Sequence, residues 1–215
     1  MEEVKPMSAR SYGQFCGLAR ALDTVGDRWS LLIVRELLLG PLRYSDLMAS
    51  LGGIATNLLA NRLRSLESSG VIERQLGQAG GVVYALTPWG TALREAIDSL
   101  VRWSSPLMVS GPDGDSFQPH WLAVALPALL TGRTAQPPAE LGIEVPGFFM
   151  TLRIDEDGPH VTVEPDRRPN TILNADGEVV LGLAAGAITI DQALSVASVQ
   201  GDRRVLTTVF AGAQT

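Results

Sequence analysis

The first half of the chain is a series of helical hydrophobic patterns that end beside glycines. Apolar residues at spacings of three and four predict helices over 15–26, 28–40 and 44–53, and a fourth from near Thr56 to Gly70. Asp27 and Ser45 are placed to cap the second and third helices. Alternating runs at 71–76 and 82–87 flank a Gly-rich joint and predict a β-hairpin. Pro88 then introduces a fifth helix over 89–103.

The second half has a different pattern. Residues 106–118 are rich in Pro, Gly, Asp and Ser, without apolar periodicity, and indicate a linker. Residues 119–130 predict a helix that Pro127 should kink or cut. Alternation over 148–166 around Asp157-Gly158 predicts a hairpin. A strand, turn and helix follow over 171–186, then a helix over 188–198, whereas 203–211 fits a helix or a strand.

These patterns predict an α+β protein of two domains. The first domain covers residues 1–105, the linker 106–118, and the second, α+β domain 119–215. The polar start of the chain lacks an apolar signal-peptide core, and the longest apolar run, 121–130, is too short to span a membrane. We therefore expect a soluble cytoplasmic protein with no membrane partner.

Composition argues against several kinds of chemical site. Cys16 is the single cysteine and the two histidines, His120 and His160, lie far apart, so neither an internal disulfide nor a zinc-ligand spacing is present. Nucleophile-elbow, phosphate-loop and dinucleotide fingerprints are also absent. We expect no catalytic residues, no metal and no cofactor, and therefore a protein that is not an enzyme.

Charge is unevenly distributed along the chain, whose net charge is −6. Residues 1–110 hold 11 basic and 10 acidic side chains, a net charge of +1, whereas residues 111–215 hold 6 basic and 13 acidic side chains, a net charge of −7. This difference in net charge would arise if the chain simply had two domains whose surfaces differ in charge without a functional reason. It also fits a protein in which only the first half approaches a polyanion.

The helix over 54–69 carries a polar stripe without carboxylates. At about 100° per residue, Leu59, Leu63 and Leu66 share one face of this helix. The opposite face carries Asn57, Asn61, Arg64 and Ser68, with Arg62 on its flank. Asn pairs with adenine and Arg with guanine in the major groove of DNA. Taken alone, such a stripe is more often an ordinary solvated helix face.

The neighbouring elements favour DNA binding for this stripe. A short helix and a turn precede it, and a hairpin follows it, which is the order of a winged helix-turn-helix. Arg43 before the third helix and Arg74 on the first hairpin strand are placed to meet phosphates. The predicted DNA-contacting residues are Arg43, Ser45, Thr56, Asn57, Asn61, Arg62, Arg64 and Arg74.

Residues 16–90 resemble the HxlR branch of the MarR-like winged-helix regulators. The resemblance rests on Cys16, GDRWSLLIVRELLLGPLRYSDL (26–47), GIATNLLANRLRSLESSGVIER (53–74) and YALTPWG (84–90). It implies a bacterial transcription factor that binds a double-stranded DNA operator as a homodimer through its terminal helices. It also implies DNA contacts from Asn57, Asn61, Arg62 and Arg64. We expect a repressor, with Trp89 and Trp103 as packing residues or dimer contacts.

The chain departs from the family pattern at two places. Ala55 stands where the family usually has a capping Ser, which would move the cap to Thr56. The loop between Arg74 and Tyr84 carries no charge. We therefore expect a weak contact between the wing and phosphates, and a shallow salt dependence of DNA binding.

Cys16 has two interpretations. The resemblance implies oxidant sensing, because the matching cysteine does so in some members of the family, and a helix N-terminus lowers a thiol pKa. A small buried apolar residue is the commoner state of a free cysteine. With a single cysteine in the chain, a redox regulator would use an intersubunit or a mixed disulfide.

The second domain resembles the sterol carrier protein type 2 fold through the Gly186 turn, the helix start at 190–193 and residues 199–202. This implies a sheet and helices around an apolar cavity for a hydrophobic small-molecule effector. The predicted lining residues are Trp121, Leu122, Phe148, Phe149, Met150 and Leu152. Each is otherwise an ordinary core residue. A lipid carrier and a dimerisation module without ligand remain as alternatives.

Overall fold

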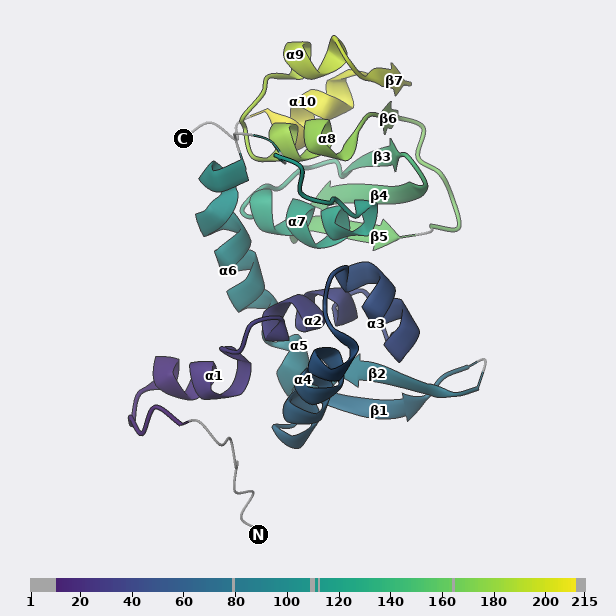
Figure 1. Cartoon of the computed structure of the whole chain (residues 1–215). Helices are drawn as coiled ribbons and strands as arrows, with labels where there is room; N and C mark the ends of the chain where they lie inside the picture. Colours follow the sequence, from purple (N-terminus) through teal and green to yellow (C-terminus); the bar gives the residue numbers. More distant parts are fainter. Residues whose placement is uncertain (1–10, 79, 109–110, 112, 164, 212–215) are drawn as a thin grey trace. The chain divides into compact units, whose positions relative to one another are not determined.

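The computed structural model describes residues 11–78, 80–108, 111, 113–163 and 165–211. The chain divides into two compact units, Met1–Ile97 and Asp98–Thr215, which are described separately (Figure 1). The division lies inside helix α6 (Arg94–Ser104), ahead of the predicted linker. Residues 109, 110 and 112 of that linker lie outside the described residues.

Four helices form the first part of unit 1, as predicted. They are α1 (Gly17–Val25), α2 (Ser30–Leu37), α3 (Tyr44–Leu51) and α4 (Thr56–Ser68). Their apolar faces meet in a core whose fully buried members include Ile33, Leu47, Leu59, Leu63 and Leu66. The core of α2 is formed by Ile33, Val34 and Leu37, whereas Leu32 is exposed.

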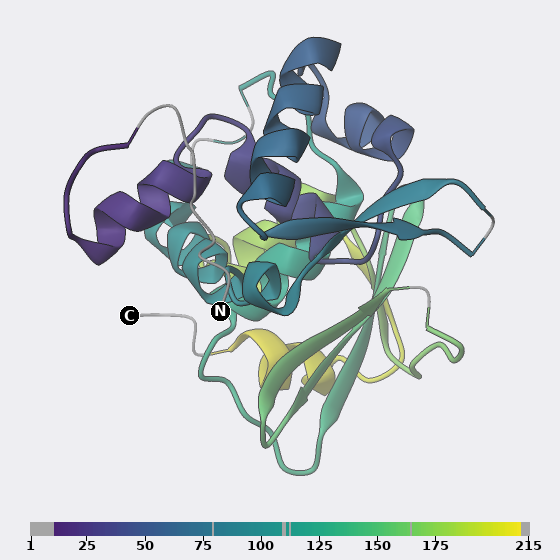
Figure 2. The same cartoon turned by 90° about the horizontal axis from the view of Figure 1, so that it is seen from below.

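The predicted hairpin follows α4. Strands β1 (Ile72–Leu76) and β2 (Val82–Leu86) pair antiparallel, with Ile72 opposite Leu86 and Leu76 opposite Val82. Gly80 and Gly81 both have positive φ at the turn, which glycine adopts without strain. In Figure 2 the hairpin extends away from the helices of unit 1 as a wing.

The helix predicted over 89–103 is two helices. The first is α5 (Pro88–Thr91), whose start is capped by the Thr87 hydroxyl accepting the Gly90 N–H at 3.0 Å. Residues 92 and 93 form a turn, after which α6 begins at Arg94. The prediction of one continuous helix was wrong because α5 stops after a single turn.

Two predicted helix caps are also wrong. Helix α2 begins at Ser30 after Trp29, whose backbone is left-handed with φ of 83°, and the Asp27 side chain instead pairs with Arg62. Helix α3 begins at Tyr44, so Ser45 lies inside its first turn. The Asp46 carboxylate accepts the Arg43 N–H at 3.2 Å and closes this turn instead.

Unit 2 contains a five-stranded sheet in the order β5-β4-β3-β6-β7. Strands β3 (Ala139–Val145), β4 (Phe148–Asp155) and β5 (Gly158–Val163) form an antiparallel meander, and β6 (Ile172–Asn174) runs parallel to β3. Strand β7 (Ser198–Gln200) pairs antiparallel with β6. The predicted hairpin turn is confirmed, since Asp155 pairs with Gly158.

The helices of unit 2 share one core with one face of this sheet. They are α7 (Leu122–Leu129), α8 (Gly177–Ala184), α9 (Ile190–Leu194) and α10 (Arg204–Phe210), with short 3₁₀ turns at Ser105–Met108 and Pro119–Trp121. Buried residues of β3 and β4, such as Ile143 and Leu152, pack with Leu122 of α7 and Phe210 of α10. Figure 1 shows the helices gathered along the sheet.

Several details of unit 2 differ from the predictions. Strand β3 was not predicted, since Gly142 interrupts its alternation, although that glycine lets the Phe149 ring come within 3.0 Å of where a Cβ would be. Pro127 does not cut α7, which continues to Leu129. The predicted helix over 188–198 ends at Leu194, and residues 204–210 are helical.

Among the described residues, no helix has both the length and the apolar character needed to cross a membrane.

Candidate nucleic-acid interface

Helix α4 presents the predicted polar stripe to solvent. Asn57, Asn61, Arg64 and Ser68 are all exposed. Leu59, Leu63 and Leu66 on the opposite face are fully buried, so packing against the core fixes which face of α4 points outward. The structure therefore brings these four polar side chains together on one accessible surface, which we call the α4 stripe.

Two members of the α4 stripe are bonded to each other. The Arg64 Nη2 donates to Asn61 Oδ1 at 2.5 Å, one helical turn away. This hydrogen bond orients the guanidinium and leaves the Asn61 amide nitrogen as a donor. A fixed pair of this kind presents several hydrogen-bond donors in a defined arrangement, which is what recognition of base edges requires.

The turn between α3 and α4 is held by a residue that sequence reasoning missed. The Tyr44 hydroxyl donates to the Thr56 carbonyl at 2.7 Å and so ties the first turn of α3 to the start of α4. Ser45 and Thr56, both predicted DNA contacts, are exposed on these two helix starts. The predicted cap at Thr56 is wrong, because Thr56 is the first helical residue and Ala55 occupies the cap position without a side-chain bond.

The arginine of the first wing strand is paired with an acid. Arg74 Nε donates to Glu67 Oε1 at 2.7 Å, which joins β1 to the last turn of α4. This hydrogen bond and the adjacent negative charge raise the pKa of the Arg74 guanidinium above its ordinary value. Glu67 therefore offsets the one positive charge that the sequence places on β1, and a phosphate must compete with it for Arg74.

Removing the acid should release Arg74 for DNA. We expect the Glu67→Gln variant to bind duplex DNA more tightly, because Arg74 loses its competitor and the surface loses a negative charge. The slope of log K against log salt should steepen by about one phosphate contact. Titration of a labelled duplex at several salt concentrations measures both quantities. The matched control is Glu73→Gln on the same strand, and an equal gain in that variant would show a general charge effect instead.

Arg43 also has a partner within the wing. Its Nη2 donates to the Gly80 carbonyl at 3.1 Å and so holds the hairpin turn beside the start of α3. The wing itself ends in exposed apolar residues, since Leu76 is 84% and Val82 is 55% exposed. The end of the wing, where the sequence has no charged residue, therefore exposes apolar side chains to solvent.

Arg62 is placed differently from the α4 stripe. Its Nη1 lies 2.7 Å from Asp27 Oδ2, and its Nε donates to the Arg28 carbonyl at 3.2 Å. Its side chain is only 20% exposed. Of the predicted DNA contacts, Arg62 is the one that the structure directs toward the turn between α1 and α2.

Cys16 is exposed at the cap position of α1. The backbone N–H groups of Ala19 and Leu18, in the first turn of α1, favour the thiolate and lower the pKa of the Cys16 thiol below its usual value. The alternative of a small buried core residue is wrong for this position.

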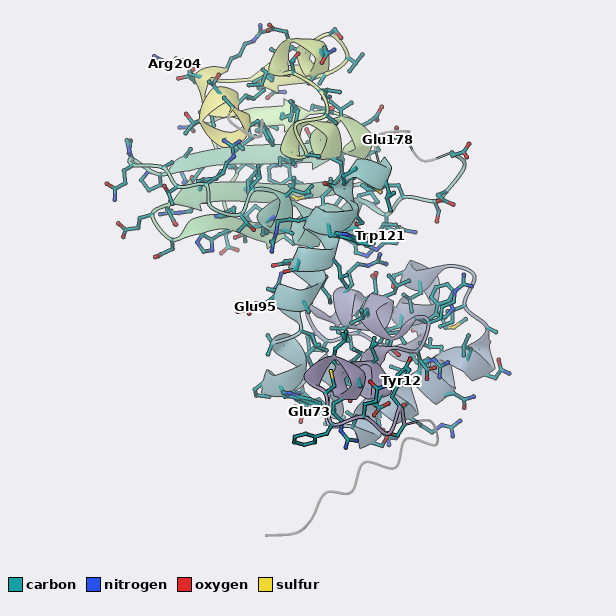
Figure 3. The ribbon with its side chains drawn as sticks, turned by 90° about the vertical axis from the view of Figure 1, so that its left-hand side faces the viewer. Tyr12, Glu73, Glu95, Trp121, Glu178 and Arg204 are labelled. Atoms are coloured by element: carbon teal, nitrogen blue, oxygen red, sulfur yellow. The ribbon has the colours of Figure 1, made fainter. Side chains whose placement is uncertain are left out.

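The six predicted effector-lining residues fall into two groups. Leu122, Met150 and Leu152 are fully buried in the core of unit 2. Trp121, Phe148 and Phe149 are partly exposed, with Trp121 just before α7 (Figure 3) and the Arg168 guanidinium 4.2 Å from the Phe149 ring centre. A separate open pocket of about 320 Å³ lies near the start of α8 and is lined by Pro146, Asn174, Ala175, Asp176, Ser195, Val196, Ala197 and Ser198.

The part of the chain that carries this interface is similar to known proteins. The family described as HxlR-like helix-turn-helix matches residues 24–110. The HTH-type transcriptional regulator YodB of Bacillus subtilis (strain 168) is 32% identical over 93 residues, which cover 42% of this chain and 83% of YodB. The uncharacterised HTH-type transcriptional regulator YtfH of Escherichia coli (strain K12) is 33% identical over 94 residues, covering 43% of this chain and 75% of YtfH.

A solved structure is also similar to part of the chain. Quinone-bound YodB from B. subtilis has 32% sequence identity and a TM-score of 0.38, covering 41% of this chain and 96% of that one.

Proposed function

Since the chain belongs to the HxlR-like helix-turn-helix family, and its relatives YodB and YtfH are HTH-type transcriptional regulators, we propose that it is a DNA-binding regulator that reads an operator with α4. The observation that carries this proposal is the α4 stripe, which is exposed and free of carboxylates, with α3 before it and the wing after it. A helix that presents donors and no acids enters the major groove without repulsion from phosphates. Repression follows when the bound operator overlaps a promoter.

We further propose that the regulator acts as a homodimer through its terminal helices. Phe15 and Leu18 of the α1 region are 102% and 69% exposed, and Tyr12, which is labelled in Figure 3, and Leu22 are exposed as well. Trp89, Leu100, Trp103 and Leu107 are exposed on α5, α6 and the turn after it. Apolar surface of this extent is typical of protein interfaces. A dimer would bind two half-sites about 34 Å apart, one helical turn of DNA.

An electrophoretic shift with the DNA upstream of the chain's own gene tests the DNA-binding proposal. The expected result is a specific complex that survives an excess of unrelated duplex and weakens as salt increases. In an in vitro transcription assay, added protein should lower transcription from the bound promoter. A protein that shifts both duplexes equally would contradict operator recognition, and increased transcription would contradict repression.

For unit 2 we propose a hydrophobic small-molecule effector, as the resemblance to the sterol carrier fold implies. The sheet with helices on one face supports this proposal, whereas the burial of Leu122, Met150 and Leu152 in the core is what packing residues would show. An effector controls DNA binding only if it binds one dimer geometry better than the other. Native mass spectrometry should detect a co-purifying apolar molecule. A carrier would hold this molecule without DNA binding, and a dimerisation module would hold none.

Cys16 supports redox control as a second candidate function. An exposed thiol with a lowered pKa is the form that oxidants and electrophiles attack. Because the chain has one cysteine, oxidation would join two Cys16 sulfurs of a dimer, with two electrons and two protons passing to the oxidant, or would form a mixed disulfide with a small thiol.

The pH dependence of alkylation tests the state of Cys16. The rate with iodoacetamide should rise with pH as the thiolate forms, and its midpoint should lie below that of a cysteine in an unstructured peptide, because the Ala19 and Leu18 N–H groups favour the charged form. Mass spectrometry of the labelled protein measures the rate, with Cys16→Ser as the blank. A midpoint equal to that of the peptide would remove the physical basis for a reactive thiol.

A further inference from the structure

Arg62 is bound on two sides by the turn between α1 and α2. Its Nη1 pairs with the Asp27 carboxylate at 2.7 Å, and its Nε donates to the Arg28 carbonyl at 3.2 Å. Because one planar guanidinium makes both contacts, its direction is fixed. We infer that Arg62 is a positioning residue that sets the orientation of α4 against this turn, and that it does not contact DNA. This inference rests on the proposed function of α4 as the recognition helix.

The turn between α1 and α2, which Arg62 contacts, has a strained backbone at Trp29. Trp29 adopts φ of 83° and ψ of −19°, a left-handed conformation that is rare for a bulky residue. Strained backbone of this kind persists only where surrounding contacts hold it. Arg62 supplies two such contacts, from the middle of α4.

The surroundings of Arg62 make it a poor phosphate ligand. The carboxylate of Asp27 lies directly against its guanidinium and would repel an approaching phosphate. The Arg62 side chain is mostly covered, whereas Arg64 is exposed on the α4 stripe and bonded to Asn61 there. The two neighbouring arginines of α4 therefore have separate roles: Arg64 faces the ligand and Arg62 faces the protein.

This division of roles predicts two different kinds of loss. Removing a phosphate contact lowers affinity for every duplex and reduces the salt slope by about one. Removing a positioning contact leaves the number of phosphate contacts unchanged but misaligns the donors of the α4 stripe. Discrimination between the operator and an unrelated duplex then falls, because base contacts depend on alignment.

The experiment compares Arg62→Met, Asp27→Asn and the double variant with Arg64→Met as the matched control. The probes are a duplex that the wild-type chain enriches from a random-sequence pool and an unrelated duplex of equal length. Affinity is measured over a salt series at a temperature where circular dichroism shows each variant folded. We expect Arg62→Met and Asp27→Asn each to lower discrimination by about tenfold with unchanged salt slope. The double variant should lose no more than either single variant.

Exchanging the two charges of the Asp27–Arg62 ion pair gives a result that a general loss of stability would not produce. In the charge-swapped variant Asp27→Arg, Arg62→Asp, the ion pair returns but the hydrogen bond to the Arg28 carbonyl does not, so discrimination should recover only in part, to a level above that of either single variant. An Arg62→Met variant whose salt slope falls by about one, as in Arg64→Met, would overturn the inference. An Asp27→Asn variant with wild-type discrimination would overturn it as well.

Hydrogen exchange without DNA separates failure of this inference from failure of the proposed function. The Ser30 N–H donates to the Asp27 carbonyl at 3.1 Å within the same turn, and its exchange should be faster in Arg62→Met than in wild type. If exchange of the Ser30 N–H were unchanged in Arg62→Met, Arg62 would not stabilise the turn, even if the chain bound DNA. A wild-type chain that enriches no duplex would contradict the proposed function of α4. Faster exchange of the Ser30 N–H in Arg62→Met would in that case still show that Arg62 stabilises the turn between α1 and α2.

Discussion

Replacing Asn61 and Arg64 together with alanine is expected to abolish operator recognition. These are the two members of the α4 stripe that are hydrogen-bonded to each other, and both are exposed. A bidentate contact to a base contributes about 1–3 kcal/mol of discrimination, so two lost contacts should lower operator affinity by at least about thirtyfold. Fluorescence anisotropy with an enriched duplex measures this loss. Binding to unrelated DNA should weaken much less.

The single variants show whether the two residues act as a unit. Since Asn61 accepts a hydrogen bond from Arg64, Asn61→Ala also frees the guanidinium, and the losses of the single variants should not add to that of the double variant. The matched control is Arg204→Ala, which removes the same charge from an exposed position in unit 2 (Figure 3). If Arg204→Ala weakened binding as much as Arg64→Ala, the effect would be one of net charge and not of the α4 stripe.

The largest expected effect on stability is that of Gly90→Ala. A Cβ at Gly90 would lie 2.0 Å from the Val71 carbonyl oxygen and 3.0 Å from its carbon, so the backbone must move. That oxygen also accepts the Thr87 N–H at 3.1 Å at the base of the wing. Overpacking against backbone costs about 3 kcal/mol or more, a large part of the stability of a small domain. Urea unfolding followed by circular dichroism measures the change.

Gly17→Ala provides the control for this substitution. Gly17 opens α1, and an added Cβ there would have no atom within 4 Å. Alanine in such an open helical position should leave the free energy of unfolding unchanged or raise it by about 0.5 kcal/mol. A Gly90→Ala protein as stable as Gly17→Ala would contradict the close approach of α5 to the base of the wing.

The sequence predicted those parts of unit 1 that local periodicity encodes. The buried face of α4, its exposed stripe and the hairpin that follows it all depend on repeats within a few residues, and the structure has each of them. The pairing of Asp27 with Arg62 could not be predicted in this way, because it joins residues far apart in the chain. Asp27 before a hydrophobic run fits a helix cap equally well, and only the tertiary contact distinguishes the two roles.

The same limit applies to the wing and to unit 2. Arg74 was predicted to meet phosphate from its place on β1, but whether Glu67 lies beside it depends on how β1 packs on α4. Strand β3 alternates inward through Leu141, Ile143 and Val145, yet Gly142 lowers its strand propensity. The side chains packed against Gly142, Phe149 and Ile172, come from other strands, so the need for a glycine is visible only in the formed sheet.

Methylation interference on an enriched duplex shows directly whether α4 reads base edges in the major groove. Dimethyl sulfate modifies guanine N7 in the major groove and adenine N3 in the minor groove, and guanine N7 is an atom that arginine binds. Methylated guanines in two half-sites, about one helical turn apart, are expected to block binding of the wild-type chain. Interference confined to adenine N3, or no interference at any base, would contradict major-groove recognition by α4.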